Sequence, residues 1–239
     1  MNDMPARVPS EEFELALSHA LAVPPNFEPA PARVVAGFLA SAEHAVLSWI
    51  AYRIGSRGAP SALAIGLLLR GRTVLILPAG RPTTRFDAAA TTAVFGALLS
   101  DLDQQPYTYA QCILGDGCEP LARVVQSAGF ARLTGLRYLE RDARYPWIEP
   151  PPGELAWLTY TPQRHSEFCA AVAATYVDTH DCPELVGCRT MDDVLAAHRS
   201  AGPFEPALWA LLLYNDRPAG VLLCTNHGRT FEIVYVGVI

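Results

Sequence analysis

The stretch TFEIVYVGVI, residues 230–239, decides how the fold is interpreted. Apart from Glu232 and Gly237, every residue in it is β-branched or aromatic, which is typical of a β-strand. Successive side chains of a strand point to opposite faces. We therefore expect one face to carry Glu232, Val234, Val236 and Val238, and the other to carry Phe231, Ile233, Tyr235 and Gly237.

The segments before this strand predict a three-stranded meander. Two apolar runs, residues 206–214 and 219–226, precede it, and the short turns NDR and HGR connect the three. Further upstream, residues 154–161 are typical of a strand, and residues 162–177 and 191–202 are typical of helices. The second half of the chain is therefore predicted as βααβββ.

The first half predicts a different order. A short amphipathic helix is expected at residues 10–22, with Ser10 as its N-cap. Beyond it, the pattern of apolar residues predicts a hairpin, a helix, a strand, a helix and a final strand. These elements are expected at residues 61–70 and 73–80, 86–103, 107–115, 120–129 and 132–142. The predicted order is ββαβαβ.

A proline-rich segment separates the two halves. Residues 145–154, YPWIEPPPGE, hold four prolines in ten positions, which favours extended backbone and disfavours a helix or a central strand. We predict a first domain at residues 1–144, a linker at 145–154 and a second domain at 155–239.

The βααβββ order and the run FEIVYVGVI resemble the GNAT superfamily of acyl-CoA-dependent N-acyltransferases. The resemblance implies an α/β fold of the α+β type, with mixed, mostly antiparallel sheets flanked by helices. In this family the signature Pxx[RQ]GxG[AG] follows the fourth strand, and its amides at a helix N-terminus hold the pyrophosphate of the coenzyme. The sequence stops before that signature would begin. The resemblance therefore implies the front half of a second domain, and an incomplete catalytic unit.

The first half carries the same resemblance in altered form. Pro78 and Arg81 stand at the expected spacing, but Pro82 and Thr84 replace the glycines of the signature. Proline has no N–H to offer a phosphate, and a threonine side chain blocks the close approach that glycine allows. The pair Gly129 and Phe130 is similar to the family's entry into its final strand. We therefore expect a degenerate first GNAT-like domain that binds no coenzyme.

Glu232 is the predicted catalytic residue. Only a neutral amine attacks a thioester, and an alkylammonium group with a pKa near 10.4 is about one part in a thousand neutral at pH 7. Burial of the strand face would disfavour the charged form of Glu232 and suit it to be a general base. EIVY also resembles the EIVF stretch that carries the base in the histone acetyltransferase branch. The alternative is a Glu at a strand entrance that points to water.

Val236, Gly237 and Val238 are the predicted cofactor-binding residues. The resemblance implies that acetyl-CoA, as co-substrate, lies against their backbone, since the pantetheine arm has two amides that can pair with an open strand edge. Gly237 would ease a bulge or a close approach there. The alternative is that Gly237 only accommodates a packing neighbour.

The charge and the apolar content of the sequence argue against nucleic acid and membranes as partners. The net charge is -6 and the chain has no Lys, so we expect no nucleic-acid partner. The longest apolar runs are shorter than the roughly 18 residues of a membrane span, and no membrane partner is expected. Six cysteines without a CxxC pair, and an N-terminus without a signal-peptide pattern, favour a reduced, cytoplasmic protein.

Other groups of histidines and cysteines in the sequence favour no different function. His180, Cys182, Cys188 and His198 match no zinc-binding spacing, so no metal is expected. His44 and His165 lie on predicted helices without an acidic partner nearby in sequence. The predicted function is an N-acetyltransferase that moves an acyl group to a small-molecule or peptide amine by direct attack. The alternative is a non-catalytic GNAT-like binding or scaffold protein.

Overall fold

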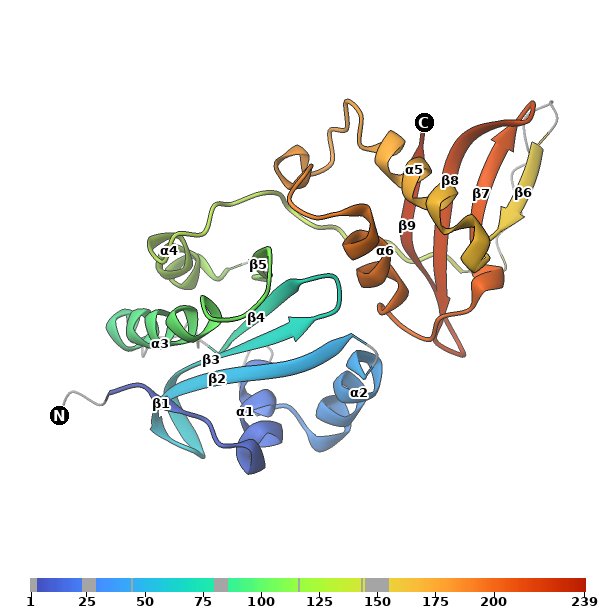
Figure 1. Cartoon of the computed structure of the whole chain (residues 1–239). Helices are drawn as coiled ribbons and strands as arrows, with labels where there is room; N and C mark the ends of the chain where they lie inside the picture. The colour runs from blue at the N-terminus through green and yellow to red at the C-terminus, as the bar shows by residue number, and fades with distance from the viewer. Residues whose placement is uncertain are drawn as a thin grey trace. The chain divides into compact units, whose positions relative to one another are not determined.

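The structure is a computed structural model, and it describes residues 4–22, 29–43, 45–79, 86–115, 117–142, 144 and 155–239 (Figure 1). The predicted linker at 145–154 and the positions Arg81, Pro82, Thr84 and His44 lie outside the described residues. Contacts divide the chain into two compact units, residues 1–131 with 200–202 and residues 132–199 with 203–239. The predicted domain boundaries at 144 and 155 stay predictions.

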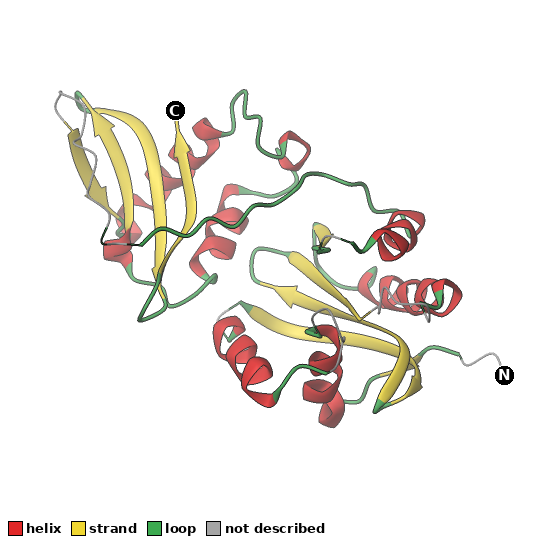
Figure 2. Ribbon diagram, turned by 180° about the vertical axis from the view of Figure 1, so that it is seen from behind, coloured by secondary structure: helices red, strands yellow, loops and turns green. Residues whose placement is uncertain are grey.

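The first unit is a three-layer α/β structure. Its elements are β1 (Ala6–Arg7), η1 (Ser10–Glu12), α1 (Phe13–Ala20), α2 (Ala32–Ala42), β2 (Val46–Ser56), β3 (Ala59–Leu69), β4 (Thr73–Ala79), α3 (Ala88–Leu102), β5 (Tyr109–Cys112) and α4 (Glu119–Ser127). The sheet order is β1-β2-β3-β4-β5, antiparallel except for the parallel pair β4 and β5. Figure 2 shows α1 and α2 on one face of this sheet and α3 and α4 on the other.

Successive side chains of β3 point to opposite faces of the first sheet, and both sets are apolar, which explains why helices cover both faces. Ala62 and Ala64 belong to the core beneath α3 and α4, whereas Leu63, Ile65 and Leu67 belong to the core beneath α1 and α2. All five side chains are at most 1 % exposed. A strand that is apolar at every position needs such a neighbour on each side.

The second unit is built around an antiparallel sheet with the order β6-β7-β8-β9. Its elements are β6 (Leu155–Thr159), η2 (Pro162–Arg164), α5 (His165–Thr175), η3 (Pro183–Leu185), α6 (Met191–Arg199), η4 (Pro206–Leu208), β7 (Trp209–Tyr214), β8 (Arg217–Asn226) and β9 (Phe231–Val238). Figures 1 and 2 show α5 and α6 on one face of this sheet. The β7–β8 turn has positive φ at both Asn215 and Asp216, the twist that two-residue hairpins require.

The element order of the first unit recurs in the second. A strand, a 3-10 turn, two helices and a three-stranded meander run from β1 to β4 and again from β6 to β9. The sequence predicted the βααβββ order of the second unit correctly. In the first unit the sequence predicted only a short helix before the hairpin and missed β1, α2 and β2. The structure therefore contains the front elements that were not predicted there.

Two local predictions in the first half are wrong. Residues 132–142 form no strand, and Tyr138 and Leu139 in them are 87 % and 93 % exposed. A strand needs a neighbouring ladder for its N–H and C=O groups, and no described strand pairs with this segment. Ser10 lies inside η1, whose N-cap is Pro9, so it does not cap the helix.

The apolar runs at residues 62–69 and 207–213 lie in β3 and in η4 with β7, respectively. Among the described residues, no helix is both long enough and apolar enough to cross a membrane.

Candidate functional site

A β-bulge interrupts β9 where the sequence predicted an even alternation. Cys224 of β8 lies opposite Ile233, but its neighbour Leu223 lies opposite Tyr235, so Val234 is an extra residue on β9. An extra residue shifts the alternation of side chains by one position on one side of the bulge.

The bulge changes the face on which Glu232 lies. Residues directly opposite each other in a ladder share a face. Glu232 lies opposite Thr225, and Tyr235 lies opposite Leu223, two positions away on β8. Glu232 and Tyr235 therefore share one face, and the prediction that Glu232 heads a face with Val234, Val236 and Val238 is wrong.

The face shared by Glu232 and Tyr235 is the face on which the helices pack. Leu223 belongs to the same buried core as Phe168 of α5 and Leu195 of α6. The catalytic carboxylate predicted from the sequence thus lies on the helix-covered side of the sheet, at the entrance of β9.

Glu232 is held by a neighbouring histidine. Its Oε2 lies 2.9 Å from Nε2 of His227, which belongs to the turn between β8 and β9. The turn is closed by a hydrogen bond from the His227 N–H to the Thr230 carbonyl and by Gly228 at φ +82°. The Glu232 side chain is 53 % exposed, so the burial that the sequence argument assumed is not found.

The outer edge of β9 leaves peptide groups open. In the described chain, β9 pairs with β8 alone. The Ile239 N–H donates to the Ala219 carbonyl at 3.0 Å, which makes these residues a hydrogen-bonded pair. Such pairs alternate along an antiparallel ladder, so Gly237 points its N–H and C=O toward β8, while Val236 and Val238 point theirs outward. Two of the three predicted cofactor-binding residues therefore offer free backbone groups.

Gly237 makes room for a helix. A Cβ at this position would lie 2.7 Å from the Cβ and Cγ2 of Thr175, the last residue of α5. Across the ladder, a Cβ on Gly220 would lie 2.6 Å from the Gly237 carbonyl oxygen. This is the packing role that the sequence left open for Gly237.

Two side chains, Thr175 and His198, lie against Tyr235, and the sequence predicted neither contact. The Tyr235 hydroxyl lies 2.6 Å from the Thr175 hydroxyl, and its ring lies against the His198 imidazole, with centroids 5.1 Å apart. Burial, and then the charge of Arg189, lower the pKa of His198 to about 4. Burial also raises the pKa of Tyr235. No sequence motif links these residues, because they come from three separate elements.

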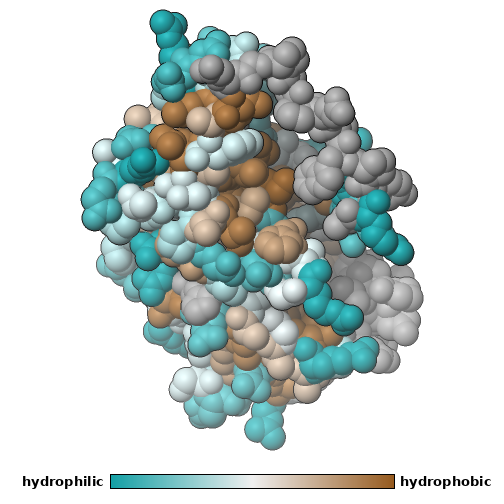
Figure 3. All heavy atoms as spheres, turned by 90° about the vertical axis from the view of Figure 1, so that its right-hand side faces the viewer, coloured by the Kyte–Doolittle hydropathy of each residue, from teal (hydrophilic) through white to brown (hydrophobic). Residues whose placement is uncertain are grey.

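The opposite face of the second sheet is apolar and exposed. Hydrophobic atoms gather over this sheet in Figure 3. The side chains concerned are more than half exposed, and they are Trp157, Phe231, Ile233, Val236 and Val238. Nothing in the described chain covers them, and the two valines continue this surface to the open edge of β9.

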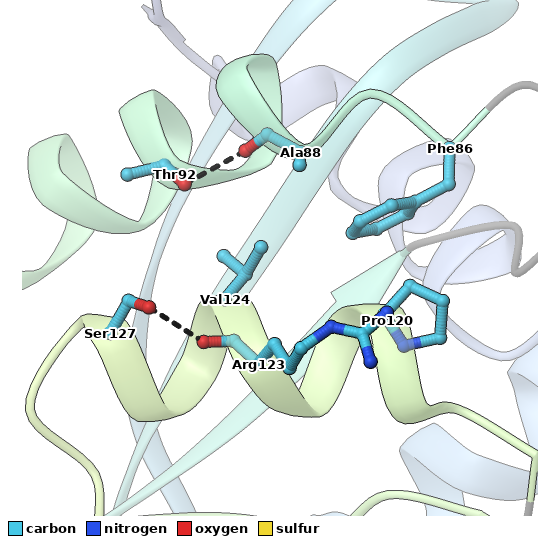
Figure 4. Close-up of a pocket in the computed structure, with 7 residues that line it drawn as sticks. All are labelled: Phe86, Ala88, Thr92, Pro120, Arg123, Val124 and Ser127. Atoms are coloured by element: carbon cyan, nitrogen blue, oxygen red, sulfur yellow. Dashed lines mark hydrogen bonds between the residues drawn. The ribbon is translucent and has the colours of Figure 1, made fainter.

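Two hollows in the first unit are lined by none of the predicted site residues. One, of about 370 Å³, lies between α3 and α4 and is lined by Phe86, Thr92, Arg123 and Ser127 among others (Figure 4). Its two hydroxyls donate to the helix carbonyls of Ala88 and Arg123, both at 2.8 Å. Both hydroxyls are therefore already used as donors, and Arg123 is the charged side chain of the lining. A second hollow, of about 390 Å³, lies beside Arg72 and Tyr107.

Comparison with known proteins supports the expected fold. No family model matches the chain, and no curated protein matches it. The crystal structure of a GCN5-related N-acetyltransferase from Sphaerobacter thermophilus is similar over 98 % of this chain and 76 % of that one, with a TM-score of 0.57 and 16 % identity. A protein from Enterococcus faecalis described as a probable N-acyltransferase aligns with 100 % of this chain and 59 % of its own, with a TM-score of 0.43 and 13 % identity. The chain therefore shares the fold of the Sphaerobacter thermophilus structure, and this is the fold that the sequence predicted.

Proposed function

We propose that the second unit is an N-acyltransferase that moves an acetyl group from acetyl-CoA to an amine. The observation that carries this proposal is the form of β9. It is a bulged edge strand with outward peptide groups at Val236 and Val238, and it has a carboxylate, Glu232, at its entrance.

The open edge of β9 suits a pantetheine arm. The arm's two amides can pair with the outward N–H and C=O groups of Val236 and Val238, as an added strand would. The Val236 and Val238 side chains lie on the exposed apolar face and offer non-polar contact beside those amides. The peptide groups of Gly237 face β8, so they are not available to the pantetheine arm. Gly237 instead allows β9 to pack closely against α5.

Glu232 is the proposed general base. Its carboxylate takes a proton from the attacking ammonium, directly or through one water, and the neutral amine then forms the new N–C bond. The C–S bond breaks as the tetrahedral intermediate collapses, and the leaving thiolate takes up the second proton, which the attacking nitrogen loses as it becomes an amide. His227, at 2.9 Å, orients the carboxylate. Because attack is direct, no covalent enzyme intermediate is needed, and the protein's contribution is positioning and electrostatic stabilisation.

Among the described residues of the first unit there is no equivalent site, and this contrast supports the assignment to the second. β4 occupies the place in the first unit that β9 occupies in the second, but it pairs with β3 without any register shift. Its sequence, TVLILPA, contains no carboxylate. The second residue of β4 is the fully buried Val74, whereas the second residue of β9 is Glu232.

Binding and turnover of acetyl-CoA test the proposal. The full-length gene product is titrated with acetyl-CoA and followed by thermal unfolding. Ligand at 100 times its dissociation constant should add about 2.7 kcal/mol of stability. Release of free thiol is then measured with a panel of primary amines. The absence of any shift with acetyl-CoA, coenzyme A or a longer acyl-CoA would support the non-catalytic alternative.

A further inference from the structure

Three metal-ligating side chains meet where α5 and α6 begin. His165 and Cys169 are one helical turn apart on α5, so they lie on the same face, and Asp192 is the second residue of α6. The His165 Nε2 lies 2.8 Å from the Asp192 Oδ1 and 3.6 Å from the Cys169 Sγ. The Sγ lies 3.9 Å from the same Oδ1. Among the described residues, this is the one group of three or more such side chains that is close enough to share an ion.

These separations are near those of a tetrahedral zinc site. Bonds of about 2.0 to 2.3 Å from zinc to nitrogen, oxygen and sulfur place neighbouring ligand atoms about 3.3 to 3.6 Å apart. The sulfur and the imidazole nitrogen already have this spacing. The nitrogen and the carboxylate oxygen would separate by roughly half an ångström as two bonds to zinc replace their hydrogen bond. Asp192 is 80 % exposed and can move to do so.

The other nitrogen of the His165 ring has a fixed partner. Its Nδ1 lies 3.0 Å from the hydroxyl of Tyr160, a residue only 8 % exposed. The Tyr160 ring packs edge-on against Phe168 and Trp209, with centroids 5.1 and 5.4 Å away. Metal-binding histidines commonly donate their second N–H to such an oxygen, which fixes the tautomer and directs the free nitrogen at the ion. Tyr160 thus directs Nε2 toward Cys169 and Asp192.

We propose that His165, Cys169 and Asp192 form a zinc site that joins α5 to α6 and leaves the fourth position to water or an anion. One thiolate, one imidazole and one carboxylate form a set that suits zinc and not magnesium or calcium, which prefer oxygen alone. The site does not rest on the proposed acyl transfer. Ten residues, about 15 Å of helix, separate His165 from Thr175, where α5 meets β9.

Zinc binding at this site has a defined proton balance. The Cys169 thiol must lose its proton to form the Zn–S bond, and the imidazole must be neutral. Calorimetry in two buffers of different ionisation enthalpy should therefore show about one proton released for each zinc bound.

Cobalt(II) is the probe that distinguishes metal binding at Cys169 from metal binding at the other cysteines. Added to the full reduced chain, Co²⁺ should give a sulfur-to-metal charge-transfer band and the visible bands of four-coordinate cobalt, and Zn²⁺ should remove both. Cys169→Ser should abolish the charge-transfer band, whereas Cys188→Ser, an exposed thiol on the same unit, should retain it. A band that survives Cys169→Ser, or no band in the parent chain, would overturn the proposal.

A second pair of variants tests the site without removing the thiol. Tyr160→Phe keeps the buried ring but loses the hydroxyl, and it should weaken zinc binding by about 10- to 100-fold. Asp192→Asn should weaken it further, whereas Asp193→Asn on the next position should leave it within a factor of two or so. Equal zinc affinity in the parent chain, Tyr160→Phe and Asp192→Asn would show that His165 and Asp192 share only a hydrogen bond. Circular dichroism confirms that each variant is folded.

Discussion

Glu232 and Tyr235 lie on the same face of β9, although an uninterrupted strand would place residues three positions apart on opposite faces. The bulge at Val234 produces this arrangement. It puts the carboxylate and the phenol on the helix-covered side of the sheet. The peptide groups of Val236 and Val238 remain at the open edge. The proposed base therefore lies on one face of β9, and the peptide groups proposed to bind the cofactor lie along the edge of the same strand.

Glu232→Gln should lower kcat for acetyl transfer by about 10²- to 10⁴-fold, the usual contribution of a positioned base. KM for acetyl-CoA should change little, because the carboxylate is assigned to the amine. Steady-state kinetics on the full-length gene product measure both. His227→Gln should have a smaller effect, since it removes only the partner 2.9 Å away. An unchanged kcat in Glu232→Gln would assign the base to another residue.

Val236→Pro should abolish the stabilisation by acetyl-CoA. Proline removes the outward N–H of residue 236 but no bond to β8, and edge positions tolerate it. Val236→Ala shortens the same side chain and keeps the N–H, so it should bind with nearly the affinity of the parent chain. Thermal shift at saturating acetyl-CoA compares the two. Equal shifts would mean that the cofactor does not pair with this edge.

The sequence predicted the β7–β9 meander because each strand and each turn carries its own local signal. Asn215 and Asp216 adopt the positive φ that such turn residues tolerate, and the runs beside them alternate or are wholly apolar. Residues 132–142 were also predicted as a strand, yet they form none. The strands β7–β9 have neighbouring strands to pair with, whereas residues 132–142 have none among the described residues. The composition of a segment does not show whether such a neighbour is present.

The site could be predicted only in part, for a related reason. The residues of β9 were identified from composition, but a bulge leaves no trace in a period-two pattern, so the face of Glu232 was predicted wrongly. His165 lies on a helix, as predicted, and has no acidic partner nearby in sequence; its acidic partner in the structure comes from a different helix. Asp192, 27 positions later, lies 2.8 Å from it. Contacts between helices that are distant in sequence depend on tertiary packing.

Gly237→Ala should destabilise the second unit by about 1 to 3 kcal/mol, because the new methyl group would lie 2.7 Å from Thr175 and force α5 away from β9. The double variant Gly237→Ala with Thr175→Gly should lose less stability than the two single changes together, since these residues are in contact. Gly96→Ala, on an open face of α3, should instead be neutral or stabilising. Urea unfolding measures all four; additive losses would contradict the contact.

The stability of the second unit should fall between pH 7 and pH 5 because of His198. Its folded pKa of about 4 lies below the ordinary 6.5, so in this range the unfolded chain binds a proton that the folded chain does not. The stabilisation is complete above pH 6.5 and is lost as the pH falls toward 4, with about 2 kcal/mol lost by pH 5.

His198→Phe keeps an aromatic ring against Tyr235 and removes the titrating group, so it should flatten that part of the profile. Urea unfolding followed by tryptophan fluorescence at pH 7 and pH 5 measures the slope, with the exposed His180→Phe as the matched histidine control. The control should retain the slope of the parent chain. If His198→Phe retained it as well, the acid sensitivity would belong to another group, and His198 would have to titrate near its ordinary pKa despite its burial against Tyr235.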